Sequence, residues 1–356
     1  MVTAMNSADV FKVASQFRVP LNCQIEITRF CNLKCKHCYL PTSERKAMQF
    51  SDYLHYLDEI NNAGCRFLTI TGGEPLTHPE FSRFYEVAVK KGFCVSLFTN
   101  ANGLTDEQLE VLSKHPPRCI EISVYGSDEN TYQKVTGNRS AFTSVVDNIR
   151  RLKAAGLRVK LKTFITKDNF NDFAGIKSLI LSLEGNDAST QNSILYDYKL
   201  LPRLDGSCDN LKYRIAPQEA FSLLCQESPD AKERWHTRIM DTAPIKTGKS
   251  QCGCGRHSFQ IDVNGFVRTC TFNSYSSLDL NHASFSAIWT TYGEMLQKAQ
   301  DDRNQESLCD NCKYANVCDI CPAISFAESH VEYGNDAVPY QCEIAKLRYE
   351  YAMRTD

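Results

Sequence analysis

The sequence predicts an α/β fold in which a partial (β/α)6 barrel precedes a smaller, cysteine-rich domain. Two observations predict it. Strand-like runs alternate with helix-like runs over residues 23–205, and a second field of cysteines with a different spacing begins at residue 252. Such alternation is typical of a parallel sheet, and the alternating stretch is shorter than the roughly 250 residues of a complete eight-unit barrel.

Each element follows from its local pattern. The first strand is the alternating run CQIEITR, and later strands are short apolar-rich runs that follow helix-like patterns. Because active residues of such barrels lie at the carboxyl ends of the strands, we expect the site in the loops RFCNLKCKHC, TGGEP, TNANG and SVYG. The strands are expected at 23–29, 67–71, 93–99, 119–125, 157–166 and 193–201, and the helices at 50–64, 79–92, 142–156 and 173–185.

The expected organisation has four parts. An N-terminal extension precedes the barrel, and a polar bridging segment separates the barrel from the second cysteine field. The expected boundaries are 1–22 for the extension, 23–205 for the barrel, 206–250 for the bridging segment and 251–356 for the cysteine-rich domain.

The composition indicates a soluble, cytoplasmic protein. The 356-residue chain has neither a continuous apolar leader nor a run of about 18 apolar residues that could span a membrane. Cytoplasmic thiols stay reduced, so the 17 cysteines favour metal binding or catalysis over a disulfide framework. A formal net charge of −2 offers no basic surface, so we expect no nucleic-acid partner and no membrane partner.

Three cysteines in the first loop point to a metal site. Cys31, Cys35 and Cys38 have the spacing C-x3-C-x2-C directly after the first strand. A structural zinc site takes four ligands, so three thiols imply either a distant fourth ligand or one metal position left open for chemistry.

The loop after the second strand makes the prediction specific. TGGEP, residues 71–75, has two glycines that allow close approach of a ligand and a carboxylate that can hold an ammonium group, although alone it would be an ordinary turn. Together with C-x3-C-x2-C, it resembles the radical S-adenosylmethionine family, whose fold is a TIM-like partial barrel. The resemblance implies that Cys31, Cys35 and Cys38 ligate three irons of a 4Fe-4S cluster.

In that family the open fourth iron binds the amino and carboxylate groups of S-adenosylmethionine, and reductive cleavage gives a 5'-deoxyadenosyl radical. His37 could instead be a solvated loop residue, and Asn100 and Ser123 could be ordinary strand-end residues. The implied contacts are Gly72, Gly73 and Glu74 to the methionine amino group, His37 beside the adenine, and Asn100 and Ser123 to the ribose or carboxylate.

The C-terminal cysteines form a second field. A zinc ribbon is one interpretation, because two C-x2-C pairs can bind zinc. However, SFQIDVNGFVR, with NG at its centre, predicts a β-hairpin that has a cysteine at each base. Eight thiols also suffice for two four-thiolate clusters. These thiols are Cys252, Cys254, Cys270, Cys309, Cys312, Cys318, Cys321 and Cys342.

This arrangement is similar to the SPASM extension of radical S-adenosylmethionine enzymes, which holds two auxiliary 4Fe-4S clusters. Two departures stand out: Cys318 and Cys321 are one residue closer than is usual in the family, and CGCG offers two thiols where one is common. The resemblance assigns Cys252 or Cys254 or both, with Cys270 and Cys321, to the first cluster, and Cys309, Cys312, Cys318 and Cys342 to the second.

Candidate catalytic residues are fewer. Cys254, if it does not ligate a cluster, could donate a hydrogen atom to a substrate radical, and Asp197 could orient a substrate amine or take a proton if it faces the barrel mouth. Cys208 lies in the polar stretch DGSCDN after the last strand and is a further candidate. We expect the other cysteines to pack in the core. They are Cys23, Cys65, Cys94, Cys119 and Cys225.

The resemblance favours a peptide substrate, because SPASM enzymes mostly crosslink, epimerise or oxidise peptides. Thr271 stands where the sulfatase-maturing branch has aspartate, which argues against that branch. With only 22 residues before the first strand, leader recognition would need a separate protein or the barrel itself. A reductant such as flavodoxin or ferredoxin is implied. The alternatives are a radical dehydrogenase or oxidase of a small metabolite and a non-enzymatic iron-sulfur or zinc scaffold.

Overall fold

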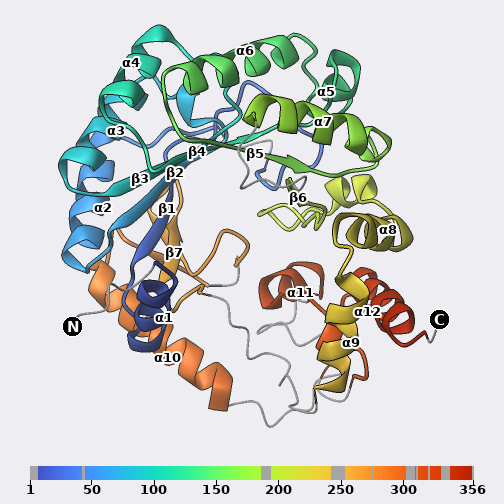
Figure 1. The fold of residues 1–356 in the computed structure, drawn as a ribbon. Coiled ribbons are helices and arrows are strands. Elements are labelled where there is room, and N and C mark those ends of the chain that lie inside the picture. Colours follow the sequence, from blue (N-terminus) through green and yellow to red (C-terminus); the bar gives the residue numbers. More distant parts are fainter. Residues whose placement is uncertain are drawn as a thin grey trace, which may run out of the picture.

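The computed structural model describes residues 7–41, 45–185, 194–241, 253–273, 276–301, 309, 312–319, 321–329 and 337–354. They form a sheet of nine strands in the order β6-β5-β4-β3-β2-β1-β7-β8-β9, and helices α2 to α7 surround its outer face (Figure 1). The predicted α/β fold class is confirmed. Within the described ranges, no helix is long and apolar enough to cross a bilayer.

All six predicted barrel strands are present, and each pairs with its neighbour in parallel. The last is shorter than predicted, because Asp197 Oδ1 accepts hydrogen bonds from the backbone N–H groups of Tyr198 (2.7 Å) and Lys199 (2.9 Å) and so ends the strand. Residue 193 of the predicted run lies outside the described residues. The strands are β1 Asn22–Glu26, β2 Phe67–Thr71, β3 Cys94–Thr99, β4 Cys119–Ser123, β5 Val159–Phe164 and β6 Leu195–Asp197.

The four predicted barrel helices are also present. Two further helices, α4 (Asp106–Lys114) and α5 (Glu129–Thr136), are missing from the prediction, although Thr105 and Gln108 form a capping box that marks the start of α4. Short 3-10 turns follow two of the strands, at Pro75–Thr77 and Phe170–Asp172. The predicted helices are α2 Phe50–Asn62, α3 Phe81–Lys90, α6 Ala141–Ala154 and α7 Phe173–Glu184.

Side chains of the strands alternate between the hydrophobic core and the barrel interior. In β1, Cys23 and Ile25 are fully buried in the core, whereas Gln24 lines a cavity inside the barrel. The prediction that Cys94 packs in the core is wrong: it is exposed, because it is the first residue of β3 and lies at the end of the sheet.

The C-terminal cysteine field continues the barrel sheet. Its first strand, β7 (Ser258–Ile261), pairs in parallel with β1, and the predicted hairpin joins it to β8 (Phe266–Arg268). Gly265 forms the turn with a φ of +86°, and β9 (Ser277–Asp279) completes the sheet. The sheet is therefore continuous across the domain boundary that the sequence predicts at residue 251.

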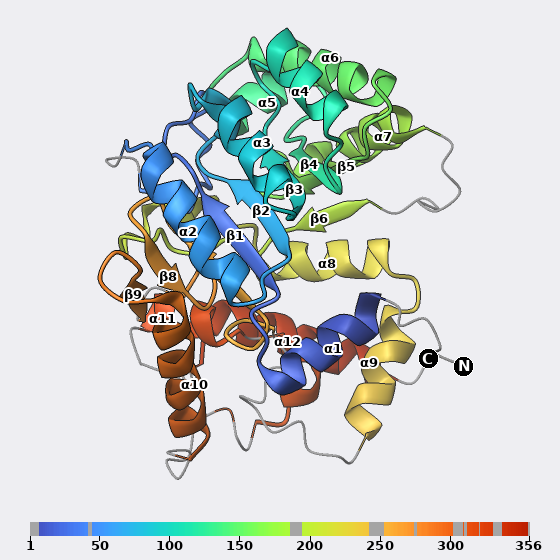
Figure 2. The ribbon, with the colours of Figure 1, turned by 90° about the vertical axis from the view of Figure 1, so that its left-hand side faces the viewer.

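The N-terminal extension forms helix α1 (Ser7–Phe17), which packs beneath the barrel (Figure 2). The ring of Phe11 lies 5.3 Å from that of His257, and the indole N–H of Trp289 in α10 (Phe285–Asp301) donates to the Arg18 carbonyl at 2.6 Å. The extension therefore links the start of β1 to the C-terminal part.

The bridging segment is helical and packs with the C-terminus. Helices α8 and α9 contact α12, and Ala231, Trp235, Val317 and Ala352 form a small second core there. The elements are the 3-10 turn Asp209–Tyr213, α8 Pro217–Glu227, α9 Ala231–Met240, the 3-10 turn Ala315–Val317, α11 Pro322–Ser329 and α12 Pro339–Ala352.

Candidate active site

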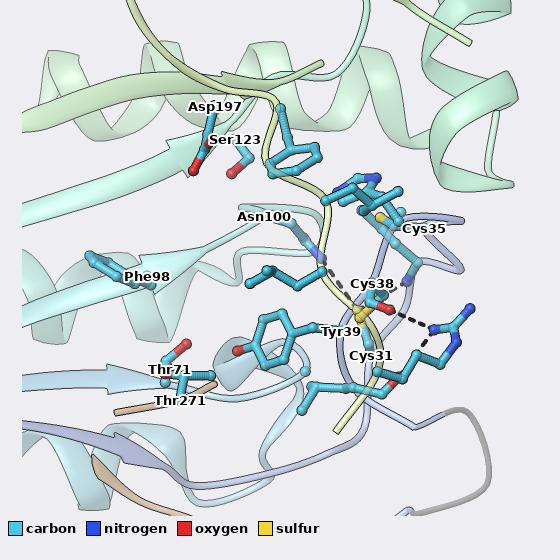
Figure 3. Close-up of a pocket in the computed structure, with 18 of the residues that line it drawn as sticks. Cys31, Cys35, Cys38, Tyr39, Thr71, Phe98, Asn100, Ser123, Asp197 and Thr271 are labelled. Carbon is cyan, nitrogen blue, oxygen red and sulfur yellow. Dashed lines mark hydrogen bonds between the residues drawn. The ribbon is translucent and has the colours of Figure 1, made fainter. Parts of the chain in front are cut away.

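A cavity of about 1070 Å³ occupies the barrel mouth at the carboxyl ends of the strands. Figure 3 shows Cys31, Cys35 and Cys38 on one wall, with Thr71 and Thr271 on another. The barrel therefore brings the first cysteine loop and the C-terminal hairpin to one space, as a parallel sheet does with the loops that follow its strands.

The loop that contains Cys31, Cys35 and Cys38 is held by backbone hydrogen bonds to α5 and within the loop itself. The backbone N–H groups of Lys34 and Lys36 donate to the carbonyls of Thr136 (2.8 Å) and Val135 (3.0 Å) at the end of α5. Within the loop, the N–H of Cys38 donates to the Cys35 carbonyl at 3.1 Å. This bracing holds the three thiols at the cavity wall.

Desolvation raises the pKa of Cys31 to about 12, although its side chain is partly open to solvent, and also raises the pKa values of Cys35 and Cys38. The charges of Cys31 and Cys38 add to the shift at Cys35. Without metal these thiols are therefore protonated at neutral pH, so metal binding must release protons.

His37 forms part of an aromatic wall. Its ring stacks on that of Phe164 at a centroid distance of 4.9 Å and lies 4.9 Å from that of Tyr125. Burial, followed by the charge of Arg203, lowers the pKa of His37 to about 4, so the ring is neutral. Its Nδ1 is buried and lacks a hydrogen-bond partner among the described residues.

The two glycines of TGGEP line the cavity, but the structure gives a second reason for them. The N–H of Gly73 donates to the Thr28 carbonyl at 2.7 Å, and the N–H of Glu74 donates to the Phe30 carbonyl at 2.8 Å. A Cβ at Gly72 or Gly73 would overlap these carbonyl oxygens. Glycine is therefore needed for the TGGEP loop to pack against residues 28–30, which lead into the cysteine loop.

Glu74 is fully buried and is not among the residues that line the cavity. Its carboxylate accepts hydrogen bonds from Thr99 Oγ1 (2.6 Å), the Asn100 N–H (2.6 Å) and the Leu76 N–H (3.0 Å). Burial raises its pKa to about 7, and these hydrogen bonds oppose the rise. The carboxylate thus ties the end of β2 to the end of β3, and its predicted contact with the methionine amino group stays a prediction.

Three of the other predicted site residues line the cavity, and one does not. Asn100, Ser123 and Asp197 are lining residues, and Asn100 Nδ2 donates to Cys31 Sγ at 3.8 Å. Cys208 is exposed, lies outside the lining and donates to the Gly206 carbonyl at 3.7 Å. The condition placed on Asp197, that it face the barrel mouth, is met.

Cys270, one of the thiols predicted for the first auxiliary cluster, lies near Cys254 and Cys321. A hydrogen bond with Cys254 lowers the pKa of Cys270, and the nearby Cys321 opposes this shift. Cys321 also lines the cavity, together with Thr271 and Phe272. Cys252 lies outside the described residues.

The thiols predicted for the second auxiliary cluster are less completely placed. Burial raises the pKa of Cys342, and the nearby Cys309 and Cys312 raise it further. Cys318 follows a 3-10 turn, and its N–H donates to the Ala315 carbonyl at 3.2 Å. In the described part of the chain, no three Cys, His, Asp or Glu side chains form a group suited to a single metal ion.

The sequence prediction missed the side chains of the inner wall. Lys162 Nζ lies 3.0 Å from Glu121 Oε2 and 4.1 Å from the ring centroid of Phe98, and all three residues line the cavity. Gln24 Nε2 donates to Thr271 Oγ1 at 3.2 Å. Alternation along the strands marks such inward positions, but only the fold shows that they share one cavity.

A partial parallel barrel with three thiols after its first strand and a glycine-rich loop after its second defines the radical S-adenosylmethionine class. Residues 25–180 match the model of the Radical SAM superfamily. This match assigns a Radical SAM domain to residues 25–180, as the sequence predicted. The family implies a 4Fe-4S cluster and S-adenosylmethionine.

Two relatives in sequence match most of the chain. The AdoMet-dependent heme synthase of Methanosarcina barkeri is 24% identical over 329 residues, covering 85% of this chain and 91% of its own length. The antilisterial bacteriocin subtilosin biosynthesis protein AlbA of Bacillus subtilis is 23% identical over 315 residues, covering 86% of this chain and 68% of its own length.

A solved structure shares the fold over nearly the whole chain. Streptococcus suis SuiB, in a crystal structure with its precursor peptide SuiA, superposes with a TM-score of 0.69 and 13% identity. The match covers 95% of this chain and 82% of SuiB. The common fold therefore includes the C-terminal part beyond residue 180.

The residues present fit the cofactors of the family. Three soft thiol ligands from one loop line the cavity, and they are the ligand type that iron-sulfur clusters take. The neutral, stacked ring of His37 in this loop offers a buried nitrogen that has no hydrogen-bond partner in the described part of the chain. The cavity is also large enough for a cofactor and part of a second molecule, since pockets for drug-sized ligands measure about 300–1,000 Å³.

Proposed function

We propose that this protein modifies a ribosomally made peptide by radical chemistry, through crosslinking, thioether formation or epimerisation. The observation that carries the proposal is the barrel cavity, which joins the cysteine loop, a wall of polar side chains and the C-terminal Cys321 in one space. AlbA, a bacteriocin biosynthesis protein, and SuiB, bound to a precursor peptide, support a peptide as substrate.

Residues of the barrel would hold the cofactors. Cys31, Cys35 and Cys38 would ligate the cluster. When bound, the cluster and S-adenosylmethionine supply a 5'-deoxyadenosyl radical that abstracts hydrogen. We assign the positions around S-adenosylmethionine to His37, Gly72, Gly73, Glu74, Asn100 and Ser123.

The inner wall would orient the substrate. Asp197 Oδ1 is occupied by two backbone N–H groups, which leaves Oδ2 to hold a substrate amine or take a proton. The ion pair of Lys162 and Glu121 gives the same cavity a donor and an acceptor. Cys208, outside the cavity lining, stays a candidate for a catalytic role only if the substrate reaches beyond the lining.

We assign two auxiliary 4Fe-4S clusters to the C-terminal cysteines and infer that both Cys252 and Cys254 ligate the first. Eight thiols fill two four-thiolate sites without remainder. The contacts of Cys270 with Cys254 and Cys321 support the first set. If Cys254 were free instead, its thiol would be a candidate hydrogen donor to a substrate radical, although Cys254 is not among the residues that line the cavity.

Partners follow from the same chemistry. An external one-electron donor, such as flavodoxin or ferredoxin, would reduce the first cluster, and either a separate protein or the barrel itself would bind the leader of the peptide. The abundance of thiols favours a reducing compartment, so we place the protein in the cytoplasm.

Metal content tests the assignment of clusters. Protein reconstituted without oxygen is expected to hold about 12 irons per chain, because three 4Fe-4S clusters are assigned. Iron and zinc are measured by mass spectrometry of the metals. Iron near four per chain, or stoichiometric zinc after purification without added metal, would contradict the two auxiliary clusters.

A change in the mass or in the residue configuration of a substrate peptide tests the proposed peptide modification. With S-adenosylmethionine and dithionite, the protein is expected to remove two hydrogens, or invert a residue, in a peptide encoded by a short reading frame beside its gene. Mass spectrometry and chiral amino-acid analysis detect these products. Formation of 5'-deoxyadenosine with every such peptide left unchanged would count against a peptide substrate.

A small-molecule substrate is the second candidate. The match to the heme synthase extends over 91% of that relative's length, and this relative favours a small-molecule substrate. One assay separates the two candidates. Cell extract is first passed through a filter that removes peptides and proteins, and the filtrate is added to the protein with S-adenosylmethionine and dithionite. A metabolite substrate in the filtrate would raise 5'-deoxyadenosine formation.

A further inference from the structure

Arg203 reaches back from the segment after β6 to the first cysteine loop. Its side chain is 8% exposed, and NH1 donates to the carbonyl of Cys38 at 2.6 Å and to that of Leu40 at 3.3 Å. The N–H of Leu204 donates to the intervening Tyr39 carbonyl at 2.9 Å. Two neighbouring residues therefore hold three consecutive carbonyls of the loop.

Arg203 is itself held in place. Its N–H donates to the Ser207 carbonyl at 2.9 Å, and its carbonyl accepts from the Gly206 N–H at 2.9 Å, so it begins a tight turn. Its Nε donates to Asp209 Oδ1 at 2.9 Å. The planar guanidinium thus bonds in two directions at once, toward Asp209 and toward the loop, which a lysine ammonium does less well.

The Asp209 carboxylate neutralises the positive charge of Arg203 only weakly on the side that faces the cysteine loop. The Asp209 side chain is 61% exposed, so water screens its carboxylate, whereas the guanidinium is buried beside Cys38. A buried cation favours negative charge nearby more strongly than an exposed one does. Adding an electron to a cluster held by Cys38 adds such a charge.

We propose that Arg203 is a positioning residue that fixes the backbone of Cys38 and raises the reduction potential of the cluster bound by the cysteine loop. This rests on the proposed function, which places a cluster there. The reduction potential of an iron-sulfur cluster depends on the charge around it, so this residue would make the first cluster easier to reduce.

The test is a redox titration of the reconstituted full-length protein, followed by electron paramagnetic resonance. The signal that changes when S-adenosylmethionine is added identifies the first cluster. In Arg203→Met, the ratio of reduced to oxidised cluster at a fixed potential is expected to fall about tenfold, equivalent to about 59 mV for one electron. Arg203→Lys should restore most of this shift.

Arg214→Met is the matched control. Arg214 lies in the same segment with a side chain 11% exposed, but it pairs with Glu328 at 2.6 Å instead of the cysteine loop. Its replacement should leave the potential unchanged. An equal shift in Arg214→Met, or an unchanged potential in Arg203→Met, would overturn the proposal.

A second variant keeps the test decisive if Arg203→Met loses the cluster. Asp209→Asn leaves the guanidinium in place and removes a counter-charge that water already screens, so the potential should stay unchanged or rise by less than the fall expected for Arg203→Met. A lower potential refutes the inference. If the wild-type protein has no signal that responds to S-adenosylmethionine, the proposed function is refuted as well. Unexpected potentials in the variants would refute only the role of Arg203.

Discussion

Replacing Cys35 with alanine is expected to abolish reductive cleavage of S-adenosylmethionine while leaving the auxiliary clusters largely assembled. Cys35 is the central thiol of the loop, and two remaining thiols would not hold the cluster. The thiols assigned to the auxiliary clusters all follow residue 251 and are separate from this loop. Formation of 5'-deoxyadenosine with dithionite is measured by chromatography, and iron per chain is expected to fall from about 12 to about 8.

Cys94→Ala is the control for this variant, because Cys94 is an exposed cysteine at the start of β3 and does not line the cavity. It should keep full iron content and full cleavage. If Cys35→Ala still forms 5'-deoxyadenosine at the wild-type rate, the assignment of the loop is wrong. Loss of all iron would instead show that assembly of the auxiliary clusters depends on the first cluster.

Replacing Gly73 with alanine is expected to destabilise the fold by about 3 kcal/mol and to displace the cysteine loop. The new Cβ would lie 2.9 Å from the carbonyl carbon of Phe30 and 3.0 Å from the Arg29 oxygen. These are backbone atoms, which cannot rotate away as a side chain would. Because residues 29 and 30 lead directly to Cys31, the variant should also lose iron from the first cluster.

Thermal unfolding followed by circular dichroism, under identical conditions for each protein, measures the destabilisation. Gly156→Ala is the matched control, because Gly156 has open space around it but a φ of +74°, so the same substitution should cost about 1 to 2 kcal/mol through the backbone alone. A Gly73→Ala protein as stable as wild type and with full iron would contradict the close packing of the two loops.

Local patterns predicted most of the barrel correctly. FLTIT became β2 at the predicted residues, and the NG-centred run became the β7–β8 hairpin, because a strand and a tight turn depend on residues within a few positions of each other. Helix α4 was missed although its capping box is a local signal. The ends of elements were predicted less well, as the shortened β6 shows, because Asp197 folds back on its own backbone there.

The predicted site residues divide in the same way. The cysteine loop and the glycine-rich loop could be located from the sequence, since each is a short contiguous motif, and their predicted roles follow from the family resemblance. The role of Glu74 as a buried link between β2 and β3 could not, because it depends on hydrogen bonds to Thr99 and Asn100 on another strand.

The sequence by itself determined the class of chemistry, through the spacing of Cys31, Cys35 and Cys38 and the TGGEP loop that follows. Only the tertiary structure decided that β7 pairs with β1, that Cys321 reaches the barrel cavity, and that Arg203 holds Cys38 across 165 positions of the chain. Motif spacing and periodicity express forces between near neighbours. Distant partners are selected by the packing of the whole sheet and its helices, which no short stretch of sequence encodes.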